Sequence, residues 1–233
     1  EGYHLLQWYQ DSQNLAYNSN RKLFVPRQGS LPYKLNTLSQ ESEQLIFDSR
    51  MHEFHLSPHE DKILFTREGS QNYRKGYQGS QASQIWLYEK ASNTYTLLIK
   101  EKWNNRSPLW RKDGKGFFHL SDESGSNDLM FYEFKSKKST LLHSGKGEHI
   151  LNISLSHDGS TLSWRRLFDL YTWKHQSSKQ ASKLTLFTQE DLANSTSENR
   201  LVKSIDTFDI SMDGLEMAFA KDGLIYVSDS KFC

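Results

Sequence analysis

Three histidines lie close together in the chain, at His52, His55 and His59. Imidazole is a common ligand of transition metals, so this spacing first suggests a metal site. Side chains alternate between the two faces of a β-strand, however, and His52 and His55 therefore point in opposite directions. No acidic cluster accompanies them. We therefore expect no metal site and no bound cofactor.

A second group of residues with useful chemistry lies in the segment 66–84. It contains two cations and two aromatic rings among glycines: Tyr73, Arg74, Lys75 and Tyr77. A guanidinium can bind a carboxylate, and cations and aromatic rings attract each other. Two interpretations stay open. Either these residues contact a peptide or protein partner, or the loop folds onto its own scaffold with Arg74 paired to a neighbouring carboxylate.

Nucleophilic catalysis would need a serine, a base and an oxyanion hole. The chain is rich in serine but contains no Gly-x-Ser-x-Gly motif and no strand-to-helix turn that could hold one. Asp169 beside Arg165 and Arg166 is interpreted as a surface pair at a hairpin. We therefore expect no catalytic residue in this chain.

The composition excludes several classes of partner. The 233 residues include 29 Lys and Arg against 28 Asp and Glu, a formal charge of +1, so we expect no nucleic-acid partner. No apolar run approaches the roughly 20 residues of a membrane-spanning helix. The opening EGYHLLQWYQ does not resemble a signal peptide. We expect a soluble protein, and the compartment, cytoplasm or periplasm, stays open. The one cysteine, Cys233, allows no intrachain disulfide.

One pattern recurs five times along the chain: an apolar residue, a turn residue three positions later, and apolar residues at +7 and +9, with His119 at +9 in the third segment. The segments begin at Trp8, Leu56, Trp110, Leu155 and Ile210, so their starts are 48, 54, 45 and 55 residues apart. The turn position holds Asp11, His59, Asp113, Asp158 and Asp213. Three of these aspartates precede glycine, a pair that favours tight hairpins.

Each segment is followed by further apolar-aromatic strands. The second strands are KLFV ending at Val25, IWLYE from Ile85, LMFYEF from Leu129, LYTW from Leu170 and LIYVS from Leu224. The third are YKLNT from Tyr33, YTLLIK from Tyr95, STLLHS from Ser139 and SKLTLFT from Ser182. We expect Trp8, Trp110 and Trp164 to lie on core strands and pack.

The repeat predicts an all-β protein, a β-propeller with about five four-stranded antiparallel blades. We expect one domain, 1–233, with blades at about 1–40, 41–102, 103–147, 148–200 and 201–233, the last incomplete. A β-sandwich also has many short strands, but it does not require the same order of turn and strands five times.

The second blade carries a more specific signal. Its stretch TREGSQNYRKGYQGSQASQIWLYE, from Thr66 to Glu89, resembles tricorn-protease-like serine peptidases, as do the stretches from Trp103 and Ser156. The resemblance implies the first propeller of such a peptidase, a six-bladed ring that admits or sorts unfolded peptides. It places the catalytic residues beyond this chain, and implies that any homo-oligomer forms through the parent protein.

Three functions follow from these observations. The first is the non-catalytic propeller of a tricorn-like peptidase, which gates peptide substrates and mediates protein interactions. The second is a TolB-like propeller that binds a partner protein with no protease attached. The third is an enzyme that acts from the propeller itself, such as a polysaccharide lyase, and the dispersed histidines argue against it.

Overall fold

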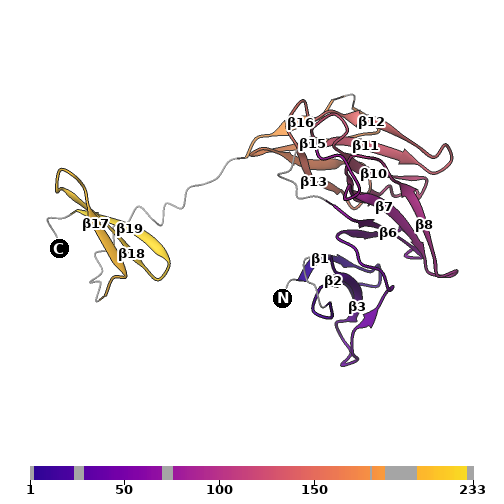
Figure 1. Cartoon of the computed structure of the whole chain (residues 1–233), viewed down its shortest axis with the longest axis horizontal. Coiled ribbons are helices and arrows are strands. Elements are labelled where there is room, and N and C mark those ends of the chain that lie inside the picture. Colours follow the sequence, from indigo (N-terminus) through magenta and orange to yellow (C-terminus); the bar gives the residue numbers. More distant parts are fainter. Residues whose placement is uncertain (1–2, 24–28, 70–75, 179, 187–203, 230–233) are drawn as a thin grey trace. The chain divides into compact units, whose positions relative to one another are not determined.

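The computed structural model describes residues 3–23, 29–69, 76–178, 180–186 and 204–229, and all their regular elements are β-strands (Figure 1). The chain divides into two compact units, Glu1–Thr185 and Leu186–Cys233. Each unit is described by itself. Among the described residues, no helix has the length and apolar character that crossing a membrane requires.

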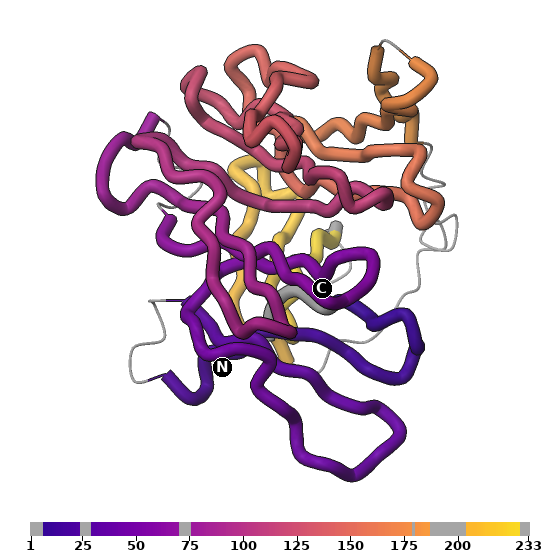
Figure 2. The backbone as a smooth tube through the Cα atoms, turned by 90° about the vertical axis from the view of Figure 1, so that its right-hand side faces the viewer, coloured from indigo at the N-terminus to yellow at the C-terminus, as the bar shows by residue number. Residues whose placement is uncertain are grey.

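The first unit contains four antiparallel sheets, and each sheet has its four strands in chain order. The first has β1 (Tyr3–Trp8), β2 (Asn14–Ser19), β3 (Leu31–Asn36) and β4 (Gln44–Leu45). The second has β5 (Phe54–Leu56), β6 (Lys62–Arg67), β7 (Gln84–Glu89) and β8 (Thr94–Ile99). Figure 2 shows the backbone passing from one sheet to the next through this unit.

The other sheets follow the same order. The third has β9 (Asn105–Trp110), β10 (Gly116–Ser121), β11 (Asp128–Glu133) and β12 (Lys138–His143). The fourth has β13 (Ile150–Leu155), β14 (Leu162–Arg166), β15 (Asp169–Trp173) and β16 (Ser182–Leu184). In the second unit, the described residues form a three-stranded sheet of β17 (Thr207–Ile210), β18 (Glu216–Lys221) and β19 (Leu224–Asp229).

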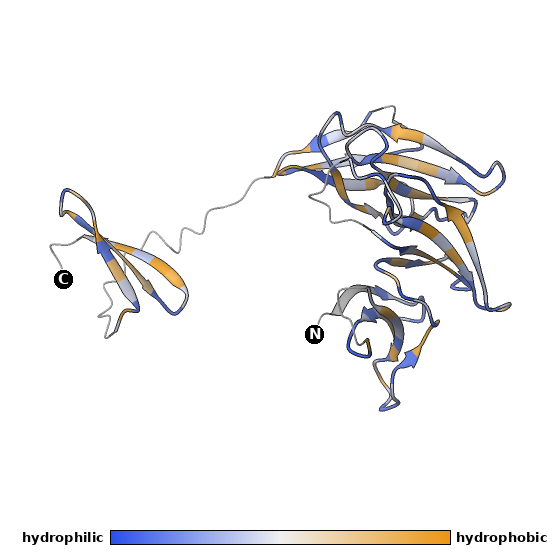
Figure 3. Ribbon diagram, in the orientation of Figure 1, coloured by the Kyte–Doolittle hydropathy of each residue, from blue (hydrophilic) through white to orange (hydrophobic). Residues whose placement is uncertain are grey.

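The sheets of the first unit pack face to face, because adjacent residues of their central strands belong to different apolar clusters. Figure 3 marks the hydrophobic residues of these strands in orange. Ile63 and Phe65 of β6 pack toward the first sheet, and Leu64 between them packs toward the third. Phe117 and Phe118 of β10 divide in the same way between the second and fourth sheets. Truncating a buried phenylalanine to alanine costs about 3–5 kcal/mol, so these rows hold the sheets together.

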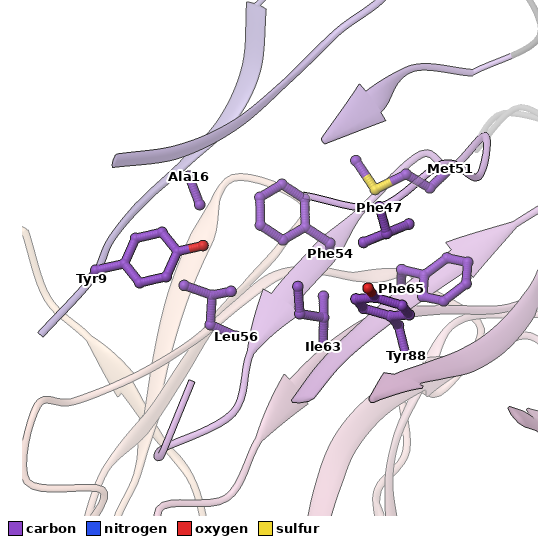
Figure 4. Close-up of a cluster of buried hydrophobic side chains, with 9 residues drawn as sticks. All are labelled: Tyr9, Ala16, Phe47, Met51, Phe54, Leu56, Ile63, Phe65 and Tyr88. Atoms are coloured by element: carbon purple, nitrogen blue, oxygen red, sulfur yellow. The ribbon is translucent and has the colours of Figure 1, made fainter. Parts of the chain in front are cut away.

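The interface between the first two sheets is a cluster of nine buried side chains (Figure 4). Phe47 packs against two other rings of the cluster, with its ring centroid 4.9 Å from those of both Phe65 and Tyr88. Phe47 belongs to the crossing between the first two sheets, not to a strand. A crossing segment thus contributes to the core as well as linking the sheets.

The predicted fold class is confirmed: the chain is an all-β protein with the repeated four-stranded sheets of a β-propeller. The two buried tryptophans predicted to pack, Trp110 and Trp164, are 4% and 2% exposed. The prediction for Trp8 is wrong, because its side chain is 57% exposed on β1. The blade boundaries and the six-bladed ring stay predictions.

The strand assignment in the first blade is also wrong. Lys22 and Leu23 lie in a turn, where the Leu23 N–H donates to the Asn20 carbonyl, and the rest of KLFV lies outside the described residues. The strand that pairs with β2 is β3, whereas the sequence pattern places the YKLNT of β3 one strand later, as the counterpart of β8 and β12. The apolar run KLFV has a higher β propensity than the sequence LPYKLN of β3, and this misled the pattern.

Candidate functional site

Strand order brings two kinds of loop to one edge of every sheet in the first unit. In an antiparallel meander, the loop between the second and third strands lies at the same end as the crossing to the next sheet. We call this end the crossing edge. It comprises the described residues of the loops 20–30, 68–83, 122–127 and 167–168 and the crossings 46–53, 100–104 and 144–149. The opposite end, with the hairpins that open each repeat, is the turn edge.

A repeated main-chain clasp joins neighbouring sheets at the crossing edge. In each case the residue just before the third strand of one sheet hydrogen-bonds to a residue at the start of the next sheet. The pairs are Ser30 with Met51, Ser83 with Asn105, and Asn127 with Ile150, at 2.8–2.9, 2.9 and 3.1 Å between nitrogen and oxygen. These bonds hold the loops against the crossings.

A buried polar pair strengthens the clasp in the third sheet. Asp122 accepts hydrogen bonds from the backbone N–H and the side-chain amide of Asn104, both at 2.7 Å. The Asn104 side-chain oxygen in turn accepts from the Ser83 N–H at 3.0 Å. All three residues are almost fully buried. The carboxylate of Asp122 therefore holds Ser83, the last residue of the loop 68–83, through Asn104.

A second carboxylate, just before β5, links the second sheet to β9 of the third sheet. Glu53 accepts hydrogen bonds from the Ser107 N–H at 2.5 Å and from the Ser107 hydroxyl at 3.1 Å. Arg106 is largely buried beside them, and this burial lowers the pKa of its guanidinium, against the opposing charges of Asp122 and Glu53. The Arg106 cation on β9 therefore experiences the charges of two acidic groups of the crossing edge.

The first strands of three sheets are irregular where they reach the crossing edge. The strand pairing shifts register within β1, β9 and β13, and in the last two the shift coincides with positive φ angles at Ser107 (52°) and Asn152 (54°). Such β-bulges change the direction in which a side chain points and are common beside binding sites. Glu53, Ser107 and Asn152 stand 54 and 45 residues apart, the spacing of the repeat starts. One position of the repeat therefore carries a polar side chain in three successive sheets.

The structure describes only part of the predicted binding loop. Tyr73, Arg74 and Lys75 lie outside the described residues. Tyr77 is half-buried, and its hydroxyl accepts a hydrogen bond from the Gln81 N–H at 3.2 Å. Gly79 donates its N–H to the Lys102 carbonyl at 2.9 Å. The second half of the loop is therefore fastened to the next crossing, and a partner-binding role for the four residues stays a prediction.

The three clustered histidines have different surroundings. Burial lowers the pKa of His55 to about 4, and its Nδ1 lies 3.0 Å from the carbonyl of Leu56, while His52 and His59 are exposed. Within the part of the chain that the structure describes, no group of three or more His, Cys, Asp or Glu side chains could hold a metal ion.

The hairpin carrying Asp169 differs in detail from the prediction. Asp169 and Arg166 face each other as backbone partners, but the carboxylate forms its ion pair with Lys183, at 2.9 Å. Arg166 instead donates to the Tyr171 hydroxyl at 3.1 Å, with its guanidinium over the same ring. The acidic group is therefore engaged at the surface of its own sheet.

Sequence reasoning missed the central residues of the crossing edge: Glu53, Arg106, Asn104 and Asp122. The available signal was the repeat spacing, because Glu53 occupies the position in its repeat that Ser107 occupies in the next repeat. Residue type alone gave no signal, because buried acidic groups of this kind resemble ordinary surface residues in a sequence.

Comparison with known proteins supports the fold. No protein-family model matches the chain, and no curated protein matches its sequence. Among solved structures it is similar to TolB from Acinetobacter baumannii, at 17% identity and a TM-score of 0.61, over 98% of this chain and 52% of that one. A second match, from an analysis of two prolyl endopeptidases, has 15% identity and a TM-score of 0.53, over 93% of this chain and 32% of the other.

These likenesses show a propeller fold and no specific family, because the identities are low. The chain spans about half the length of the A. baumannii TolB. The tricorn protease, which the sequence resembles in the second blade, matches at 12% identity and a TM-score of 0.48, over 96% of this chain and 26% of that one. That similarity is too weak to distinguish it from other propellers.

Proposed function

We propose that this chain is a non-catalytic β-propeller that binds a peptide or protein partner through its crossing edge. The observation that carries the proposal is how this edge is built. Two of its loops, 20–30 and 68–83, are long, and buried hydrogen bonds such as those of Asp122 and Asn104 hold the end of the second against the next crossing. Binding residues are commonly found on loops held by a rigid scaffold, and this edge has that form.

The acidic groups of the crossing edge also favour binding over catalysis. Asp122 is engaged by Asn104, and Asp128 accepts hydrogen bonds from Ser124, Ser144 and the Gly145 N–H. A general acid or base must reach a substrate proton. Carboxylates occupied by the scaffold are poorly placed for this, whereas they are well placed to hold a binding loop.

Within this proposal, the loop residues Tyr73, Arg74, Lys75 and Tyr77 contact the partner. The experiment compares the chain with the double variant Arg74→Glu, Lys75→Glu on an array of short random-sequence peptides. We expect the charge reversal to reduce binding at least tenfold. The control, Lys135→Glu, changes an exposed lysine at the turn edge and leaves binding unchanged. Equal binding by all three proteins contradicts the assignment of this loop.

The resemblance of Thr66–Glu89 supports a more specific role, the gating of peptides for a tricorn-like serine peptidase, with a TolB-like binding module as the alternative. The reading frame around this chain separates them, because the first requires a peptidase core downstream. The purified chain is expected to hydrolyse no peptide in either case. Hydrolysis that survives removal of contaminating proteases would refute both.

A further inference from the structure

The hairpin between β14 and β15 has two features that do not favour folding. Its two-residue loop is Leu167–Phe168, and Leu167 has a φ angle of 53°. Glycine, asparagine and aspartate are the residues that adopt positive φ easily in such a loop, and leucine there is strained. The side chain of Leu167 is also 55% exposed, and that of Phe168 is 98% exposed.

The described residues of the first unit leave both side chains largely uncovered. The ring of Phe168 lies almost entirely in solvent, so its burial contributes nothing to the packing between sheets. Backbone strain of this kind persists where the surrounding structure holds it, and it concentrates at functional sites. The hairpin loop belongs to the crossing edge, as do the other loops that join second and third strands.

Positive charge surrounds the two apolar residues. Arg165 is exposed immediately before the loop, and Arg166 is held over the Tyr171 ring at 4.9 Å from its centroid. Lys146 of the neighbouring crossing is exposed and acts with Arg166 on His143, whose pKa is lowered first by burial and then by these charges. The acidic groups here are Asp169, already paired with Lys183, Glu148 of the same crossing, and the buried Asp128.

We propose that Leu167 and Phe168, flanked by Arg165 and Arg166, form an anchor for an acidic polypeptide segment with apolar side chains. Aromatic and arginine residues dominate the energy of protein interfaces, and here both stand on a short, rigid hairpin. A partner segment buries the Phe168 ring and places its carboxylates beside the arginines. The inference rests on the proposed binding function and assigns it a second contact and a partner chemistry.

The experiment measures binding of a synthetic peptide that mixes glutamate with leucine and phenylalanine, beside an otherwise identical peptide with lysine in place of glutamate. We expect Phe168→Ala and Arg165→Glu each to weaken binding of the acidic peptide at least tenfold. The controls are Leu38→Ala, an apolar residue 75% exposed at the turn edge, and Lys135→Glu, and both leave binding unchanged.

A third variant separates folding from binding. Leu167→Gly relieves the strain, so we expect a higher melting temperature together with weaker binding of the acidic peptide. Lys137→Gly provides the matched control, because Lys137 has a φ of 55° at the turn edge: it raises the melting temperature and leaves binding unchanged. A Leu167→Gly protein that binds as well as the original overturns the proposal.

Two further outcomes also overturn it. One is equal binding of the lysine peptide. The other is binding of anionic phospholipid vesicles that depends on Phe168 while the acidic peptide fails to bind, because the hairpin would then be a membrane contact. If the peptide array still depends on Arg74 and Lys75 but no peptide depends on Phe168, the proposed function stands and this inference falls.

Discussion

The two ends of each sheet are built by different means. At the turn edge, an aspartate caps its own hairpin: Asp158 accepts from the Ser160 N–H at 3.0 Å, and Asp213 accepts from the Leu215 N–H at 3.1 Å. At the crossing edge, Glu53 reaches a residue 54 positions away, and Asp122 reaches one 18 away. The bonds of these turn-edge aspartates are exposed and local, whereas the bonds of these crossing-edge carboxylates join distant residues and are partly or fully buried.

This difference predicts where the molecule is sensitive to change. Bonds made by exposed neighbouring residues are easily replaced by water, so they contribute little to stability. Bonds made inside the molecule leave an unsatisfied group when one partner is removed, and that costs far more. We therefore expect the free energy of unfolding to respond mainly to the crossing edge.

The largest effect is expected for Asp122→Ala. The change leaves the N–H and the side-chain amide of Asn104 buried without their acceptor, which should lower the free energy of unfolding by about 3 kcal/mol. Urea denaturation measures the loss. Asp113→Ala at the turn edge is the matched control, with an expected loss of about 1 kcal/mol or less. Equal losses would mean that the two edges do not differ.

An intermediate effect is expected for the bond between Glu53 and Ser107. Replacing Glu53 with glutamine keeps the size of the side chain but removes its charge, so the free energy of unfolding should fall by about 1 kcal/mol. A double-mutant cycle of Glu53→Gln with Ser107→Ala isolates the contact. The two changes should be non-additive by about 1 kcal/mol, and strict additivity would show that the contact is energetically silent.

The smallest effect is expected at the turn edge, and it depends on pH. Hydrogen bonds from Ser156 and Ser160 lower the pKa of Asp158 from 3.8 to about 2. A carboxyl group whose pKa is lower in the folded state stabilises above its unfolded pKa and loses that contribution as the pH falls. Above pH 3.8 the melting temperature of the protein should be slightly higher than that of Asp158→Asn, and the difference should shrink as the pH falls and vanish below about pH 2. A difference that grows on acidification contradicts this assignment.

The same contrast explains what the sequence could predict. The turn edge was predictable because its signal is local: an aspartate, often followed by glycine, stands at a fixed distance from two apolar positions. The main-chain turn follows from those few residues. Of the five strands expected directly after the repeated segments, four were placed correctly for the same reason, and they are β7, β11, β15 and β19. The failure at KLFV came where a strongly apolar run competed with a weaker true strand, β3.

The crossing edge was not predictable from residue type. The loop 66–84 could be recognised by its length, since hairpin loops usually have roughly 2–5 residues. The roles of Asn104 and Arg106 depend on which sheets lie next to each other, and that is a property of the assembled fold. The exposure of Trp8 likewise depends on what covers one face of β1, which a strand pattern does not specify.

Side chains add to some of the clasps between successive sheets, as where the Ser30 hydroxyl donates to the Met51 carbonyl at 3.2 Å and the Asn127 amide donates to the Ile150 carbonyl at 3.3 Å. The bond that recurs in all three clasps, however, joins two peptide groups. A bond of this kind constrains position without constraining identity. Mutation can therefore rewrite most of the surface, one residue at a time, while the backbone path is inherited unchanged. A chain of this kind keeps its backbone fold even when its sequence diverges.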